Sequence, residues 1–398
     1  MPAFLLYGVR YLQVIPMARL ALLLALLIAA PSLAEAQNNA DAEKLLARAI
    51  ELHQAGDILG ATDSYKAALA IAPDRGDALS NLGAAYVRLG QFDDAVAQYN
   101  HALKNDPTNT SIRLNLALAY YKSARPQLAV PELRRIVASS PDAKNAYLVL
   151  AECYLQLGQD AEVISLLKPR EQMFATDAAY AYLLGTALLH TNDLVEGQKY
   201  VDRVFGAGES AEARLLLGMA YLGQQDYRSA KAEVEQSIKL NERLATVHSL
   251  YGRALLALGD QESAEREFRR ELELNVNDFE ANLQMGHVRR IQQRFDEAST
   301  YLERAVTIRP GDLSGRKLLA SLRLQTGKTD EAVAMLEAIV KEAPELIEAH
   351  VQLATGYARQ KRTEDAQRER EIIDRLTAEA QAKQPGAKPP DKGGDSKP

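Results

Sequence analysis

The sequence predicts an all-α protein, a right-handed α-α superhelix (solenoid) of about ten 34-residue helical hairpins. Three observations carry this prediction. Apolar residues recur with a period of 34, one position of every period is Gly or Ala, and Gly and Pro punctuate the period at fixed places. A fixed period of about 20 to 50 residues is the mark of stacked repeats, and it sets the architecture of the whole chain.

The repeat is clearest in residues 76–109. There the pattern residues stand at unit positions 4, 7, 8, 11, 15, 20, 24, 27 and 32, and they are Leu79, Leu82, Gly83, Tyr86, Gly90, Ala95, Tyr99, Ala102 and Pro107. Ten units follow this frame, the fifth being one residue shorter. They begin at Ala42, Gly76, Thr110, Lys144, Ala178, Ala211, Ala245, Phe279, Leu313 and Ile347.

Each unit is predicted to contain two helices that pack closely. Positions 4, 7, 8 and 11 fall on one side of a helix at 100° per residue. Position 8 is small in all ten units, and position 20 is Ala in eight, the exceptions being Val163 and Gly197. Small residues at both positions let the two helices of one hairpin approach each other.

Gly and Pro are expected to end the helices. Gly occupies position 15 in five units, at Gly56, Gly90, Gly158, Gly259 and Gly327, where a left-handed residue would end the first helix. Pro occupies position 32 in five units, at Pro73, Pro107, Pro141, Pro310 and Pro344, where it would end the second helix.

This pattern resembles the tetratricopeptide repeat, whose signature is W-x2-L-G-x2-Y, then A-x3-F, then P. The resemblance covers residues 42–376, and it departs from the signature in lacking Trp at position 4 throughout. One hairpin cannot bury its apolar face alone, so the units are expected to stack into the right-handed superhelix that the resemblance implies.

The N-terminus has the features of an export signal. Arg19 precedes the apolar run at residues 20–30, and Ala34-Glu35-Ala36 supplies a cleavage site before Gln37. We expect a signal peptide at residues 1–36, with Met17 as an alternative start, followed by a linker at 37–41. The predicted location is exported, periplasmic or secreted, of bacterial type. An uncleaved membrane anchor is the alternative; after cleavage no stable membrane insertion is expected.

Two other segments depart from the repeat. Pro169 falls inside a second helix and Ala175 replaces the terminal Pro, so we expect a bend or looser interface between the fourth and fifth units. Arg370 stands where an apolar residue is usual, which is typical of a capping helix. Residues 377–398 are rich in Pro, Gly and Lys and are predicted to be disordered.

Composition excludes several classes of function. Lys and Arg number 47 against 53 Asp and Glu, a formal charge of −6, so nucleic acid is not an expected partner. The single Cys153 cannot form an intrachain disulfide, and six scattered His residues show no metal-ligand spacing. The Arg-rich stretch from Arg266 to Arg294 is interleaved with Glu, which favours a salt-bridged surface. We expect no catalytic residues, no metal and no cofactor.

First helices should line the concave side of the solenoid, with positions 2, 5, 9, 12 and 13 pointing away from the packing positions. In repeats three to six these positions are unusually apolar, and they predict a surface for a protein or peptide segment. We name the predicted partner-binding residues the inner wall: Leu114, Leu118, Tyr121, Lys122, Leu148, Tyr182, Leu189, Leu215, Met219, Leu222 and Arg253. The alternative is that neighbouring first helices bury these Leu side chains against one another.

The function that fits these features is a non-catalytic interaction scaffold of the cell envelope. It would bind a partner segment in its groove and support assembly, secretion or surface-polymer machinery. The alternative is a regulatory subunit of an envelope enzyme complex, such as a glycosyltransferase or a protease.

Overall fold

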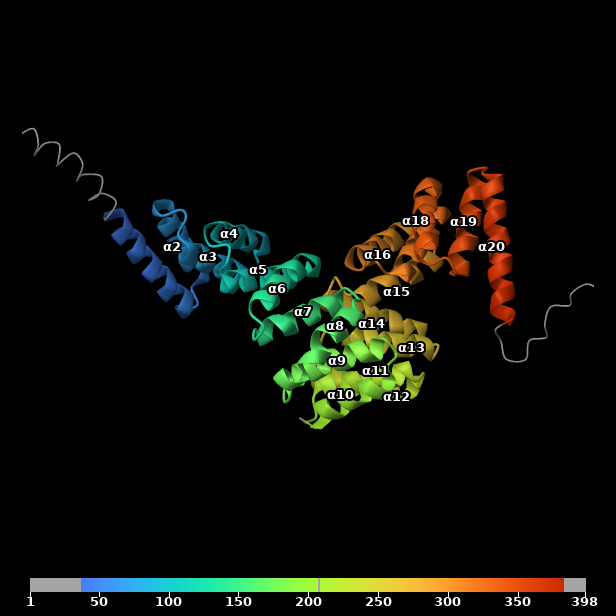
Figure 1. The fold of residues 1–398 in the computed structure, drawn as a ribbon, viewed down its shortest axis with the longest axis horizontal. Coiled ribbons are helices and arrows are strands. Elements are labelled where there is room, and N and C mark those ends of the chain that lie inside the picture. Colours follow the sequence, from blue (N-terminus) through green and yellow to red (C-terminus); the bar gives the residue numbers. More distant parts are fainter. Residues whose placement is uncertain (1–36, 207, 383–398) are drawn as a thin grey trace, which may run out of the picture. The chain divides into compact units, whose positions relative to one another are not determined.

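The computed structural model describes residues 37–206 and 208–382, and within these ranges the regular structure is entirely helical (Figure 1). The predicted signal peptide at 1–36 and residues 383–398 of the predicted tail lie outside the described residues. The described residues form two compact units, divided after Pro141.

The first unit holds three hairpins. A helix over residues 37–55 is followed by α2 (Ile58–Ile71), α3 (Gly76–Arg88), α4 (Phe92–Asn105), α5 (Thr110–Lys122) and α6 (Pro126–Ser139). Sequence neighbours pack against each other, α3 on α4 and α5 on α6. One continuous core, which includes Tyr65, Tyr99 and Leu116, runs through the unit.

The second unit continues the same arrangement. Its helices are α7 (Lys144–Gln156), α8 (Asp160–Leu167), the 3-10 helix η1 (Lys168–Phe174), α9 (Ala178–His190), α10 (Leu194–Gly206), α11 (Ala211–Gly223), α12 (Tyr227–Leu240), α13 (Val247–Ala257), α14 (Gln261–Leu274), α15 (Phe279–Ile291), α16 (Phe295–Ile308), α17 (Leu313–Gln325), α18 (Thr329–Glu342), α19 (Ile347–Arg359) and α20 (Thr363–Ala382). Odd-numbered helices here are first helices of a repeat. The predicted solenoid of helical hairpins is confirmed within each unit.

Position 15 of the repeat has a left-handed backbone in all ten hairpins. The five predicted Gly residues have positive φ angles, from 70° at Gly158 to 89° at Gly56. In the other five repeats the same position is positive without Gly, at Ala124, Asn192, Gln225, Gln293 and Lys361. Because this conformation strains residues that carry a Cβ atom, hairpin packing must hold it in those five repeats.

Small residues at position 8 allow the two helices of a hairpin to touch. A Cβ atom built on Gly83 would lie 2.7 Å from the Tyr99 ring, and one on Gly252 would lie 2.7 Å from the Phe268 ring. Tyr99 and Phe268 both occupy position 24 of their repeats. The prediction that small residues permit close packing is therefore confirmed, and a Gly83→Ala change would force the aromatic ring to move.

Position 4, where the family signature has Trp, carries a charged pair in four repeats. A cationic or imidazole side chain at position 4 faces Glu at position 23 in Arg113–Glu132, Arg214–Glu233, His248–Glu267 and His350–Glu369. The Arg214 and His248 pairs both span 2.7 Å. The two helices of these hairpins are thus joined by an ion pair where an indole ring would fill the space.

Two boundaries differ from the sequence predictions. Residues 37–41, predicted as a linker, already belong to the first helix, and α20 runs to Ala382 instead of ending at 376. Residues 377–382 are mostly Ala, Glu and Gln, which are strong helix formers, so α20 propagates past its repeat. Only Ala366 of α20 is buried, which agrees with its predicted role as a polar capping helix.

The segment after α8 contains the bend that Pro169 predicts, and its aromatic side chains are packed. It becomes the 3-10 helix η1, with Arg170 outside helical geometry. Phe174 is buried and stacks on Tyr180 with 5.0 Å between ring centroids. The division into two compact units falls instead after Pro141, between the third and fourth repeats.

Candidate partner-binding surface

The part of the inner wall in the first unit lies on α5 and stays accessible. Leu114, Leu118 and Tyr121 are half-buried, and Lys122 is exposed. Their spacing of four and three residues places the first three on one face of the helix. The packing residues of α5, which include Leu116, lie on the opposite side and are buried. Part of the apolar and aromatic surface on this face of α5 therefore remains accessible to solvent.

The part of the inner wall in the second unit is divided by burial. Leu148, Tyr182 and Leu222 are half-buried, and burial raises the pKa of the Tyr182 hydroxyl. Three others are buried, namely Leu189, Leu215 and Met219.

The expectation of an open wall does not hold for these three side chains. Helix α9 contacts both α7 and α11, and its residues from Leu183 to Leu189 are all buried. Their burial agrees with the alternative left by the sequence, that these side chains pack inside the fold. Leu189 packs on the second helix α10, where a Cβ atom on Gly197 would lie 2.7 Å from its Cδ2. Whether any inner-wall residue contacts a partner stays a prediction.

The polar end of the inner wall is bridged by loose ion pairs. Arg253 on α13 is exposed, and its Nε lies 3.8 Å from a carboxylate oxygen of Glu280 on α15. Lys317 on α17 lies 3.9 Å from Glu348 on α19. Partly exposed pairs at such distances contribute about 1 kcal/mol or less, so these side chains can turn to another partner at low cost.

A buried polar cluster joins α13, α14 and α15, and it was not predicted from the sequence. The Glu271 carboxylate accepts hydrogen bonds from the backbone N–H groups of Thr246 and His248, at 3.0 and 3.2 Å. The Ser249 hydroxyl donates to Asp278 at 2.6 Å. Both carboxylates are nearly inaccessible, with exposed fractions of 1% for Glu271 and 5% for Asp278.

Burial and mutual repulsion perturb the acids of this cluster. Burial, followed by the charge of Asp278, raises the pKa of Glu271 to about 7. Burial also raises the pKa of Asp278, against the hydrogen bond from Ser249. Burial lowers the pKa of His248, but its hydrogen bond to Glu267 and the nearby carboxylate charges outweigh that effect, and the net shift is upward. The sequence signal that could have predicted the cluster is an acid at a packing position, such as Glu271. Such an acid can accept hydrogen bonds from the free N–H groups at the start of a neighbouring helix.

The remaining candidates for chemistry are accounted for by packing and pairing. Cys153 is fully buried, and burial raises the pKa of its thiol to about 12, so it is an inert core residue as predicted. Within residues 37–206 and 208–382 there is no group of three or more His, Cys, Asp and Glu side chains suited to a metal ion. Arg266, Arg269 and Arg289 pair with Glu262 and Glu265 at 2.8 Å, which confirms the predicted salt-bridged surface.

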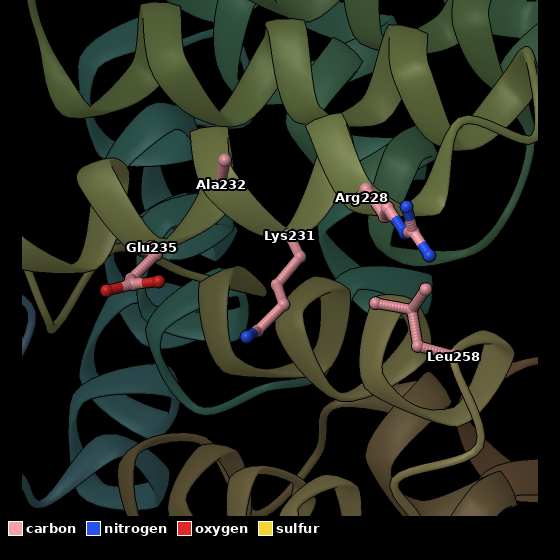
Figure 2. A pocket seen from close by; sticks show the side chains of 5 residues that line it. All are labelled: Arg228, Lys231, Ala232, Glu235 and Leu258. Carbon is pink, nitrogen blue, oxygen red and sulfur yellow. The ribbon is translucent and has the colours of Figure 1, made fainter.

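One surface pocket of about 380 Å³ lies between α12 and the end of α13 (Figure 2). Arg228, Lys231, Ala232 and Glu235 line it from α12, and Leu258 closes it from the residue after α13. The lining mixes two cations, one acid and one exposed Leu, and it contains no nucleophile or metal ligand set. It is a shallow feature between two helices of adjacent repeats.

The described ranges contain no helix that is both long enough and apolar enough to span a bilayer. The stacked hairpins, the left-handed position 15 and the apolar first-helix surfaces define an α-solenoid of the kind that presents an extended surface for recognition.

Family models identify this solenoid. A TPR repeat model matches residues 85–123, one tetratricopeptide repeat model matches 122–187 and 290–352, and another matches 215–278 and 252–313. Together they span 85–187 and 215–352, more than half of the 398 residues. The chain belongs to the tetratricopeptide repeat family, and its repeats indicate a protein–protein interaction scaffold.

Individual relatives are distant. The chain is 26% identical over 143 residues to tetratricopeptide repeat protein 8 of Caenorhabditis elegans, which covers 35% of this chain and 28% of that protein. A chain in the crystal structure of the APC/C hetero-tetramer Cut9-Hcn1 is similar with a TM-score of 0.46 and 16% identity, covering 74% of this chain and 58% of that one. The chain thus spans less than two-thirds of the length of either relative.

Proposed function

We propose that this protein is a non-catalytic scaffold of the cell envelope that holds a segment of a partner protein on the accessible part of its inner wall. The observation that carries the proposal is the face of α5. Leu114, Leu118 and Tyr121 leave apolar surface uncovered there, and Lys122 adds a cation at its end. An apolar helix face rimmed by charge suits an amphipathic peptide.

The family assignment supports a role in recognition, and the chemistry of the described residues supports the absence of catalysis. The thiol is buried, and the imidazoles of His248 and His350 are hydrogen-bonded at helix ends. The accessible surface of the first helices is what remains available for binding a partner. Assembly, secretion or surface-polymer machinery are the settings in which an exported scaffold of this kind would act.

A photoreactive amino acid at position 118 tests the binding surface in cells. We expect crosslinks from position 118 and none from position 128, because Leu128 is also exposed, at 46%, but lies on the second helix α6. Lys122→Gln should weaken the crosslink from position 118. Equal crosslinking from both positions would show that α5 has no special role.

Export is the second part of the proposal, and it is motivated by Arg19, the apolar run at 20–30 and the Ala34-Glu35-Ala36 site. N-terminal sequencing of the protein from a cell-envelope or secreted fraction should begin at Gln37. Recovery of the protein from the cytoplasm with residues 20–30 intact would contradict it.

A further inference from the structure

A contact within the second unit joins residues that are far apart in the sequence. Arg309 follows α16, at the end of the eighth repeat, and Gln156 ends α7, in the fourth repeat. The Arg309 Nε donates to the carbonyl oxygen of Gln156 at 3.0 Å, and its Nη2 donates to that of Leu155 at 3.1 Å. The separation is 153 residues, whereas a repeat in a solenoid ordinarily contacts only its neighbours.

The receiving end is the C-terminus of a helix, which favours a cation. The last carbonyl groups of α7 have no partner within the helix, and the helix dipole places partial negative charge there. The Leu155 carbonyl also accepts from the Gly158 N–H at 3.0 Å, and Arg309 supplies a further donor. The planar guanidinium can reach two carbonyls at once, which a Lys ammonium cannot match.

Residues on both sides of the contact position the Arg309 side chain. A Cβ atom on Gly158 would lie 3.2 Å from the Cδ and Nε atoms of Arg309, so the Gly allows the side chain to approach. The guanidinium is held on its own side by the Phe279 ring, 4.4 Å from its centre, and by the nearby charge of Asp278. The side chain is therefore oriented before it reaches α7.

We propose that Arg309 is a clasp that closes repeats four to eight of the second unit into a single turn. Burial at position 5 of the first helices agrees with a closed turn. Position 5 is half-buried at Leu148 and Tyr182, in repeats four and five, and buried at Leu215, Ser249 and Leu283, in repeats six to eight, whereas Val351 in repeat ten is 47% exposed. Release of the clasp lets the end of α7 and the end of α16 separate, so Arg309 sets the curvature of this turn.

Spin labels on the full chain measure the clasp directly. Cys introduced at Gln159 and Gly311 would stand on either side of it, since both residues are exposed and a Cβ atom on Gly311 meets nothing within 4 Å. The native Cys153 is buried and should take up no label, which the unmodified chain verifies. We expect a short, narrow distance distribution when Arg309 is present.

Variants at Arg309 decide the proposal. Arg309→Gln should shift the distances to longer and broader values, and Arg309→Lys should give an intermediate result because it keeps the charge but loses the two-carbonyl geometry. Arg266→Gln, which removes exposed contacts with Glu262 and Ser263 within α14, should change nothing. A narrow, short distribution in folded Arg309→Gln would overturn the clasp. If that variant does not fold, an unchanged distribution in Arg309→Lys would overturn it.

Hydrogen exchange provides a second measurement. In Arg309→Gln, the amides of residues 155–159 should exchange about tenfold faster, because one local restraint is lost. Those of α5, in the first unit, should keep their rates. Unchanged exchange at residues 155–159 would show that the two hydrogen bonds restrain nothing.

Discussion

The first helices of repeats six and seven place different chemistry at the same position of the repeat. At position 5, α11 has Leu215 and α13 has Ser249, and both are buried. Leu215 is apolar, whereas Ser249 donates a hydrogen bond to the buried Asp278. Position 5 is buried in both repeats. Repeat six has an apolar side chain there, and repeat seven has a polar side chain that is hydrogen-bonded.

The comparison shows that side-chain polarity and solvent accessibility are separate properties of the inner wall. The apolar first-helix positions of repeats three to six predict an accessible surface, with burial of these side chains as the alternative. In the structure Leu215 and Met219 are covered, while the polar Ser249 is covered as well. Solvent accessibility therefore depends on the position along the solenoid. Side-chain polarity determines only whether a buried position is stabilised by apolar packing or by hydrogen bonds.

The largest expected effect is on the apolar side of the comparison. Leu215→Ala should lower the free energy of unfolding by about 2 to 5 kcal/mol, because it leaves a cavity at a fully buried site. Urea unfolding followed by circular dichroism measures it. Val351→Ala is the matched control at position 5 of α19 and should change stability by about 0.5 kcal/mol or less. A small loss at Leu215 would mean that the wall is open after all.

The polar side should respond nearly as strongly. Ser249→Ala removes one of the two donors to Asp278 Oδ1, leaving the Ala281 N–H, and should cost about 1 to 3 kcal/mol because a buried carboxylate loses a hydrogen bond. The same urea measurement applies, with Ser299→Ala on the exposed side of α16 as the control. A neutral result for Ser249 would indicate that water or a neighbouring side chain replaces the hydroxyl, and that the two regions are less alike than their burial suggests.

The polar side should also make stability depend on pH. The raised pKa values of Glu271 and His248 mean that the folded state holds their protons more tightly than the unfolded state. Their contribution is therefore present at low pH, and it is lost as pH rises through the folded-state pKa values. We expect the seventh repeat to lose on the order of 1 to 2 kcal/mol between pH 5 and pH 8.

Hydrogen exchange at the Thr246 and His248 amides, corrected for intrinsic rates, would follow this loss. Glu271→Gln should flatten the pH dependence, and Glu273→Gln, an exposed neighbour on α14, should leave it unchanged. A local stability that increases between pH 5 and pH 8 would contradict the assignment of the buried acids.

The smallest expected effect concerns the loose ion pairs. Arg253→Gln breaks the 3.8 Å contact with Glu280 and should change the free energy of unfolding by about 0.5 kcal/mol or less. Chemical denaturation at low and high salt measures it. A loss above 1 kcal/mol would show that charge pairing, and not the buried cluster around Ser249, holds the polar repeats together.

The sequence by itself determined the hairpin. The 34-residue period, the small residues at positions 8 and 20 and the five Gly residues at position 15 specify two helices, their close contact and the turn between them. These features act between residues of one unit, so the repeat pattern records them directly. The accessible face of α5 was predicted for the same reason, because it depends on one helix and its immediate neighbours.

Only the tertiary structure decided which inner-wall residues are covered. Leu118 is half-buried, whereas Leu189, Leu215 and Met219 are buried although they stand at the same set of first-helix positions. Arg309 reaches the carbonyls of Leu155 and Gln156 across more than four repeats. The curvature of a solenoid is the sum of small rotations between units, and no single unit encodes that sum. Burial on the inner wall and contacts between distant repeats therefore depend on the assembled chain.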